Sequence, residues 1–247
     1  MNALPDPVAI AESPRLLADI NHWLAGCSAA QRVAWALQAL AGTHALSSSF
    51  GAQAAVSLHL VTQIQPDIPI ILVDTGYLFP ETHRFVAELR ERLALNLHVY
   101  RPRPEAAWSP ARIEHLYENG GQRLGPYNHV HKVEPMQRAL RELGVSTWIT
   151  GIRRNQSSRR AGIEFLELRD GRWKLHPLAD WSDRDVGRYL GRHDLPWHPL
   201  WHQGYLSIGD THGSRRWEPG LREEDLRFAG LRRECGLHFD DEAERAA

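Results

Sequence analysis

The end of the chain carries the side chain best suited to nucleophilic chemistry. Cys235 lies in the segment Leu-Arg-Arg-Glu-Cys-Gly-Leu-His, where two arginines precede it and His238 follows it. A cysteine is nucleophilic as its thiolate, and nearby positive charge favours that form. On these eight residues alone, a helix that ends near Cys235 with Gly236 as its left-handed cap is the more common arrangement. Evidence from the rest of the chain is needed to distinguish a reactive Cys235 thiolate from a Cys235 that only packs against its neighbours.

Two further segments place small polar residues at expected strand ends. Ser47, Ser48, Ser49 and Gly51 follow one apolar strand and precede a helix, whose N-terminus attracts anions. This is not a Walker loop, because no Gly-Lys-Ser/Thr follows. Asp74, Thr75 and Gly76 follow the apolar run Ile-Ile-Leu-Val and are able to face a base or ribose. Ordinary turns remain the alternative for both segments.

Four arginines lie within ten residues after the strand expected over 146–150. Guanidinium groups bind phosphate or sulfate in a bidentate way, although a run of charges is more often a solvated loop. The position at a strand's carboxyl end favours anion binding. The candidate binding residues of this segment are Gly151, Arg153, Arg154, Ser157 and Arg160.

Other polar residues are ambiguous by themselves. Lys132 begins an expected helix, and Arg215 and Arg216 precede a tryptophan, so surface roles are the default for all three. Tyr205 lies between two histidines with spacings that suit a metal site, but no carboxylate or thiol completes one. Packing or surface roles are more common for such residues.

Hydrophobic periodicity predicts alternating strands and helices after a helical lead-in over residues 1–42. Strands are expected over 44–50, 70–73, 97–100, 146–150, 164–168 and 173–176, and helices over 10–24, 29–40, 80–95, 130–143, 182–190 and 223–231, with one more helix after Gly51. This alternation predicts an α/β fold whose mostly parallel, twisted sheet has helices on both faces. We expect one catalytic domain over 1–230 and a flexible C-terminal tail over 231–247. Ligands of such sheets bind beyond the carboxyl ends of the strands, where the three polar segments begin.

Composition narrows the function classes. The 247 residues are 43% hydrophobic and carry a net charge of −1, which suits one α/β domain and argues against nucleic-acid or membrane binding. The chain has no apolar run near the roughly 20 residues that span a bilayer. Its two cysteines form no metal-ligand spacing, so we expect a reduced, cytoplasmic protein without a disulfide framework.

Seven segments occur in an order that resembles the thioredoxin-dependent phosphoadenylyl-sulfate (PAPS) reductases. They are SSSFGAQAAVSLHLV, VDTGYLFPET, HKVEPMQRAL, GIRRNQSS, HPLADWSDRDV, HPLWHQGYLSIGDTH and LRRECGLH. The resemblance implies the adenine nucleotide α-hydrolase-like (PP-loop) fold and a homodimer. It also implies reduction of PAPS to sulfite and adenosine 3′,5′-bisphosphate in assimilatory sulfate reduction. Reduced thioredoxin is the implied electron donor, with glutaredoxin as a possible substitute.

The same resemblance implies roles for individual residues. The Cys235 thiolate would take the sulfo group as an S-sulfonate, with a disulfide between the Cys235 residues of two protomers as the rival intermediate. Lys132, Arg215 and Arg216 match positions near the phosphosulfate, and Tyr205 matches an assisting tyrosine. His238 would lower the pKa of Cys235 or dock the tail. Arg153, Arg154 and Arg160 are candidates for the phosphates, and a Lys132→Ala variant is expected to lose binding or turnover without unfolding.

One departure separates this chain from the related adenylyl-sulfate (APS) reductases. Those enzymes hold a four-iron, four-sulfur cluster on four cysteines, whose positions here are Tyr127, Asn128, Asp210 and Gly213. Because such a cluster needs thiolates, we expect no iron–sulfur cluster and PAPS rather than APS as substrate. The alternatives are an APS reductase, an ATP-cleaving adenylyltransferase or ligase of the same fold, and a non-catalytic nucleotide-binding protein.

Overall fold

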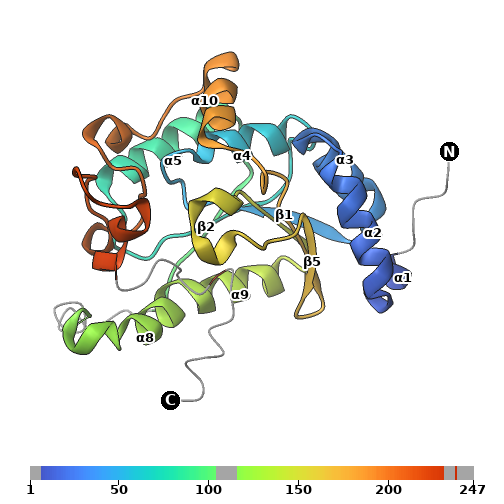
Figure 1. Ribbon diagram of the computed structural model, residues 1–247, viewed down its shortest axis with the longest axis horizontal. Helices are drawn as coiled ribbons and strands as arrows, with labels where there is room; N and C mark the ends of the chain where they lie inside the picture. Colours follow the sequence, from blue (N-terminus) through green and yellow to red (C-terminus); the bar gives the residue numbers. More distant parts are fainter. Residues whose placement is uncertain (1–6, 104–115, 231–236, 238–247) are drawn as a thin grey trace.

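A six-stranded sheet in the order β3-β2-β1-β4-β6-β5 forms the centre of the computed structural model, which describes residues 7–103, 116–230 and 237 (Figure 1). The strands are β1 (Thr43–Ser47), β2 (Ile70–Val73), β3 (Leu97–Tyr100), β4 (Val145–Thr150), β5 (Leu166–Arg169) and β6 (Arg172–Leu175). All neighbouring pairs of these six strands are parallel except β5–β6, which is antiparallel. The predicted mostly parallel α/β sheet is confirmed.

Helices cover both faces of the sheet (Figure 1). One face packs against α4 (Ala54–Thr62), α5 (Pro80–Arg92) and α10 (Asp183–Arg192), whose core continues into α1 (Pro7–Glu12), α2 (Pro14–Ala25) and α3 (Ala29–Ala39). The other face packs against α9 (Glu134–Glu142), preceded by α8 (Leu124–Asn128). No helix in the described part of the chain is both long and apolar enough to cross a membrane.

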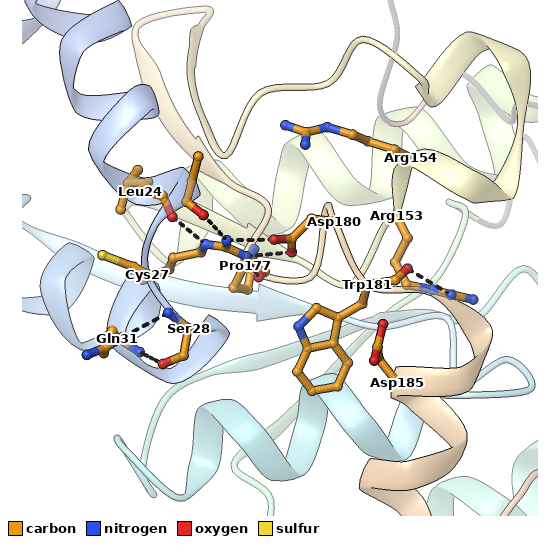
Figure 2. A network of polar contacts seen from close by, with 12 residues as sticks. Leu24, Cys27, Ser28, Gln31, Arg153, Arg154, Pro177, Asp180, Trp181 and Asp185 are labelled. Carbon is orange, nitrogen blue, oxygen red and sulfur yellow. Dashed lines mark hydrogen bonds and ion pairs between the residues drawn. The ribbon is translucent and has the colours of Figure 1, made fainter.

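Arg32 joins the helical lead-in to the loop after β6. Its buried guanidinium donates to both carboxylate oxygens of Asp180 at 2.6 and 2.7 Å. It also donates to the carbonyl oxygens of Leu24 and Pro177, each at 2.9 Å (Figure 2). A guanidinium with this many fixed partners serves packing rather than ligand binding. Cys27, nearby, places Sγ 3.6 Å from a backbone oxygen and has no activating cluster among the described residues.

Local chemistry shifts the boundaries of two expected elements. The helix expected over 10–24 is two helices, because the Ser13 hydroxyl caps a new helix that begins at Pro14. The helix expected over 130–143 begins with a π-helical turn at His129–Val133 and continues as α9. Lys132 lies in this turn, and such turns are frequent at functional sites.

The expected C-terminal helix over 223–231 is wrong for the residues described. Residues 223–230 form two 3₁₀ turns, η7 (Glu223–Leu226) and η8 (Phe228–Gly230). Phe228 has a φ of +47°, which stops a helix from continuing through it. The division into a domain over 1–230 and a tail over 231–247 stays a prediction.

Candidate active site

A cleft of about 320 Å³ lies beyond the carboxyl ends of β1 and β4, the neighbouring strands at which the strand order reverses. A larger cavity of about 660 Å³ lies between α2 and β5, away from these strand ends. Only the first cavity brings the predicted segments together. The predicted residues that line it are Ser47, Ser48, Ser49, Gly51, Thr75, Lys132, Gly151, Arg153 and Arg160.

The loop from β1 to α4 is narrow and fixed. The Ser47 hydroxyl accepts a hydrogen bond from the Trp148 indole at 2.7 Å, and the Ser48 hydroxyl accepts one from the backbone N–H of Phe50 at 3.1 Å. Phe50 has a φ of +50°, a costly conformation for a bulky residue, and its fully buried ring holds it there. A Cβ on Gly51 would lie 3.3 Å from the carbonyl oxygen of Ile208. Gly51 therefore lets the loop pass close to the segment at Ile208.

The arginines after β4 have different environments. Arg153 is buried, and its guanidinium donates to Asp183 at 2.8 Å and to Gln53 at 2.5 Å. Arg154 extends in another direction (Figure 2), donates to the Ile163 carbonyl at 2.8 Å and lines the larger cavity instead. Arg160 lines the cleft and donates to the Gln156 side chain. Arg160 is thus the arginine of this segment best placed to meet a ligand, while Arg153 holds the cleft wall.

A buried ion pair forms one wall of the cleft. Lys132 Nζ lies 2.6 Å from Asp210 Oδ2, and both side chains are at most 6% exposed. Thr75 donates its hydroxyl proton to Asp210 Oδ1 at 2.5 Å, and Tyr127 donates to Oδ2 at 3.1 Å. The backbone N–H of Thr211 donates to the Tyr77 carbonyl at 2.8 Å, which holds this segment against the loop after β2.

Charge controls protonation in this cluster. Burial alone would raise the pKa of Asp210, but the Lys132 ammonium, the Thr75 hydroxyl and the Arg227 guanidinium together hold it well below its usual range. Burial and the nearby Asp210 carboxylate raise the pKa of Tyr127. Burial lowers the pKa of His212, whose Nε2 lies 2.9 Å from the Tyr127 hydroxyl. Asp210 is therefore ionised, and Tyr127 stays a neutral phenol.

Arg227 is a cleft residue that the sequence did not indicate. It lines the cleft, and its guanidinium lies directly over Gly209, where a Cβ would collide with it. A backbone bridge between Ser214 and Arg227 holds the segment in place. Phe228, next to it, is fully buried, and Lys132 Nζ lies 4.8 Å from its ring centroid. Because the sequence predicted a helix over 223–231, neither Arg227 nor Phe228 was predicted as a site residue.

Several predicted site residues do not line the cleft. Asp74 pairs with Arg101 at 2.9 Å and accepts the Gly76 N–H at 3.0 Å. The others outside the lining are Gly76, Arg154, Ser157, Tyr205, Arg215 and Arg216. Arg215 and Arg216 are exposed, and the Arg216 guanidinium lies 5.6 Å from the Tyr205 ring centroid.

The proposed nucleophile lies beyond the described part of the chain. Cys235 and His238 both fall outside the described residues. Leu237, between them, is described: it lines the cleft and packs against the cluster that contains Met136 and Trp148. Leu237 is the described residue of the predicted tail, and its side chain lies at the cleft.

The four positions that carry cysteines in APS reductases offer no thiolate here. Tyr127 and Asp210 are hydrogen-bonded to each other, and Asn128 is buried beside Tyr127. A Cβ on Gly213 would lie 2.8 Å from the Phe228 ring, so the remaining space is filled. Among the residues described, no three or more His, Cys, Asp or Glu side chains are arranged to hold a metal ion. An iron–sulfur cluster needs thiolates, so its absence from this protein stays a prediction from the side chains at these positions.

The family model described as the phosphoadenosine phosphosulfate reductase domain matches residues 43–216. This chain belongs to that family. A phosphoadenosine 5′-phosphosulfate reductase of Xanthomonas axonopodis pv. citri is 58% identical over 240 residues, which cover 97% of this chain and all of the relative. One of Alkalilimnicola ehrlichii is 57% identical over 234 residues, covering 95% of this chain and 94% of the relative.

Solved structures agree with the family and the fold. The PAPS reductase of Candida auris, in a phosphate complex, superposes with a TM-score of 0.70 at 27% identity, covering 82% of this chain and 98% of that one. The FMN adenylyltransferase of Candida glabrata gives a TM-score of 0.56 at 16% identity, covering 78% and 64%. The second likeness shows the shared PP-loop fold alone.

Proposed function

We propose that this PAPS reductase family member reduces PAPS to sulfite and adenosine 3′,5′-bisphosphate, with Cys235 as the nucleophile. The observation that carries the proposal is the cleft between β1 and β4. There a serine-rich loop at a helix N-terminus faces Lys132, Arg160 and Arg227. An anionic nucleotide requires such a surface, and the family membership supplies the sulfonated nucleotide as the substrate.

The chemistry needs an external reductant. The Cys235 thiolate attacks the sulfonate sulfur, the bond from that sulfur to the phosphate oxygen breaks, and the bisphosphate leaves with the electron pair. The product is the S-sulfonate of Cys235. A thiolate of reduced thioredoxin then attacks Cys235 Sγ, which releases sulfite and leaves a mixed disulfide between the two proteins. The second thioredoxin thiol attacks the thioredoxin sulfur of that bond, which forms the thioredoxin disulfide and frees the Cys235 thiolate. Two electrons pass from the dithiol to the sulfo group, and glutaredoxin is an alternative donor.

Substrate and nucleophile are both anionic, so positive charge must neutralise their repulsion before they meet. Lys132 and Arg227 stand on the same wall of the cleft, beside Asp210. The two cations Lys132 and Arg227 and the one carboxylate Asp210 together leave this wall with one net positive charge, which is able to attract the phosphosulfate. The backbone N–H groups near Gly51 are available to phosphate or sulfate oxygens.

Arg160 is the residue we assign to the 3′-phosphate. It lines the cleft at the end of β4, whereas Arg153 is committed to Asp183 and Gln53. An arginine binds a phosphate dianion strongly enough to distinguish PAPS from APS.

The central test compares PAPS with APS in the presence of reduced thioredoxin, with sulfite as the readout. We expect sulfite from PAPS in preference to APS, from protein that contains no iron. Cys235→Ser is expected to bind PAPS and release no sulfite. Sulfite from APS by an iron-containing protein would instead support an APS reductase. Turnover of ATP that survives Cys235→Ser would support an adenylyltransferase. Binding without any turnover would support a nucleotide-binding protein.

The resemblance also supports a homodimer, which sedimentation analysis tests directly. If the intermediate is a disulfide between two Cys235 residues, the dimer must bring two tails together. A non-reducing gel of enzyme mixed with PAPS distinguishes that species from the S-sulfonate.

A further inference from the structure

Asp210 is the point where three segments of the cleft wall meet. Its carboxylate receives Lys132 from the π-helical turn before α9 and the Thr75 hydroxyl from the loop after β2. The Tyr127 hydroxyl from α8 completes the set, and the side chain of Asp210 is 1% exposed. Nothing in the proposed reaction uses this carboxylate directly.

The charges around Asp210 are mostly positive or neutral. Lys132 and Arg227 are the cations, and both lower the pKa of Asp210. The titratable groups that interact with this carboxylate are Lys132, Arg227, Tyr77, Tyr117, Tyr127, His131 and His212. Burial lowers the pKa of both histidines and raises that of the tyrosines, so these neighbours are neutral near pH 7. One buried carboxylate thus stands beside two cations.

Two neighbouring cations repel each other unless an anion lies between them. The ammonium of Lys132 is held from one side by Asp210 and from another by the Phe228 ring, 4.8 Å from its centroid. Arg227 lies next to Phe228 in the chain and over Gly209, which adjoins Asp210. The carboxylate therefore holds the Lys132 ammonium directly, and its charge acts on the Arg227 guanidinium at the same wall of the cleft.

We infer that Asp210 is a positioning residue that acts as the shared counter-ion of Lys132 and Arg227 and sets their geometry for the transferring sulfo group. The inference rests on the proposed function, because the cations have to meet a phosphosulfate for their geometry to matter. A purely structural carboxylate would influence stability alone. A positioning carboxylate influences turnover separately from nucleotide binding, because binding needs charge whereas transfer needs alignment.

The test measures turnover and nucleotide binding in separate assays. In Asp210→Asn we expect adenosine 3′,5′-bisphosphate to bind at least as tightly as in wild type at about pH 7, because the cations lose their counter-ion. We expect kcat for sulfite release from PAPS to fall roughly 10²-fold, the cost of a misplaced group.

Two further variants distinguish the position of the Asp210 carboxylate from its charge, and both from the stability of the folded protein. Asp210→Glu keeps the carboxylate but moves it by one methylene, so we expect a nucleotide affinity close to that of wild type with a lowered kcat. Asp180→Asn unpairs the buried Arg32, and neither residue lines the cleft, so we expect lower thermal stability with unchanged kcat and affinity. Asp210→Glu also tests the inference if Asp210→Asn does not fold.

The inference is overturned if kcat of Asp210→Asn or Asp210→Glu equals that of wild type. It is also overturned if kcat and affinity fall together with stability, as a merely structural residue would require. Failure of the proposed function looks different: wild-type protein would release no sulfite from PAPS. In that case the nucleotide affinities of Asp210→Asn and Asp210→Glu still report whether Asp210 acts as the counter-ion of the two cations.

Discussion

Replacing Lys132 by methionine should destabilise the folded protein substantially, which revises the expectation drawn from the sequence. The ammonium is 2.6 Å from Asp210, and the substitution would leave that buried carboxylate without its closest cation. Breaking a buried ion pair on one side costs about 3–5 kcal/mol. Hydrogen bonds from Thr75 and Tyr127 remain in place, so we expect the lower part of that range.

Urea denaturation at neutral pH measures this cost. A loss of about 3 kcal/mol corresponds to a midpoint lowered by roughly 1–2 M urea. The matched control is Arg84→Met, which breaks the exposed Arg84–Glu81 pair of 2.7 Å and should cost only about 0.2–1 kcal/mol. In the double variant Lys132→Met with Asp210→Asn, the second change should cost much less than it does alone. Equal midpoints for Lys132→Met and Arg84→Met would refute the buried-pair reasoning.

Three further predictions concern single residues. Burial lowers the pKa of His198 to about 4, so its ring is neutral when folded. The free energy of unfolding is then highest above about pH 6.5 and falls as the pH drops towards 4, by at most about 3 kcal/mol from this ring. Urea titrations at several pH values should show that the free energy of unfolding depends less on pH in His198→Gln than in wild type. An unchanged pH dependence would contradict the buried, neutral state assigned to the His198 ring. Arg160→Gln should lower kcat/KM for PAPS about 10–100-fold and leave kcat/KM for APS unchanged, because one charge-assisted contact to the 3′-phosphate is lost. An equal loss of kcat/KM for both substrates would show that Arg160 does not bind the 3′-phosphate. Gly209→Ala places a methyl group against the Arg227 guanidinium and should raise KM for PAPS with little change in melting temperature; an unchanged KM would show that Arg227 does not bind substrate.

The sequence predicted the parts of the cleft that depend on alternation of strands and helices. Ser47 and Gly151 were placed because apolar runs precede them and parallel strands bring their carboxyl ends together. The Lys132–Asp210 pair could not be predicted, since the two residues are far apart in sequence and their approach depends on tertiary packing. The two meet only where the segment after Ile208 packs against the loop after β2.

Arg227 shows a different limit of sequence analysis. Its segment has the spacing of an amphipathic helix, and nothing in the composition indicates that Phe228 adopts a left-handed backbone. The motif instead directed attention to Arg215 and Arg216, which are exposed and outside the cleft lining. Lys132 and Arg227 line the cleft because tertiary packing brings their segments to Asp210, which arginine density in the sequence does not indicate.

Mass spectrometry of the intact enzyme mixed with PAPS, before any reductant is added, tests the central claim most directly. The account predicts a mass increase of one sulfo group on Cys235, its absence in Cys235→Ser, and its removal with release of sulfite when reduced thioredoxin is added. An unmodified Cys235, with no disulfide between protomers, in enzyme that nevertheless releases sulfite would contradict it.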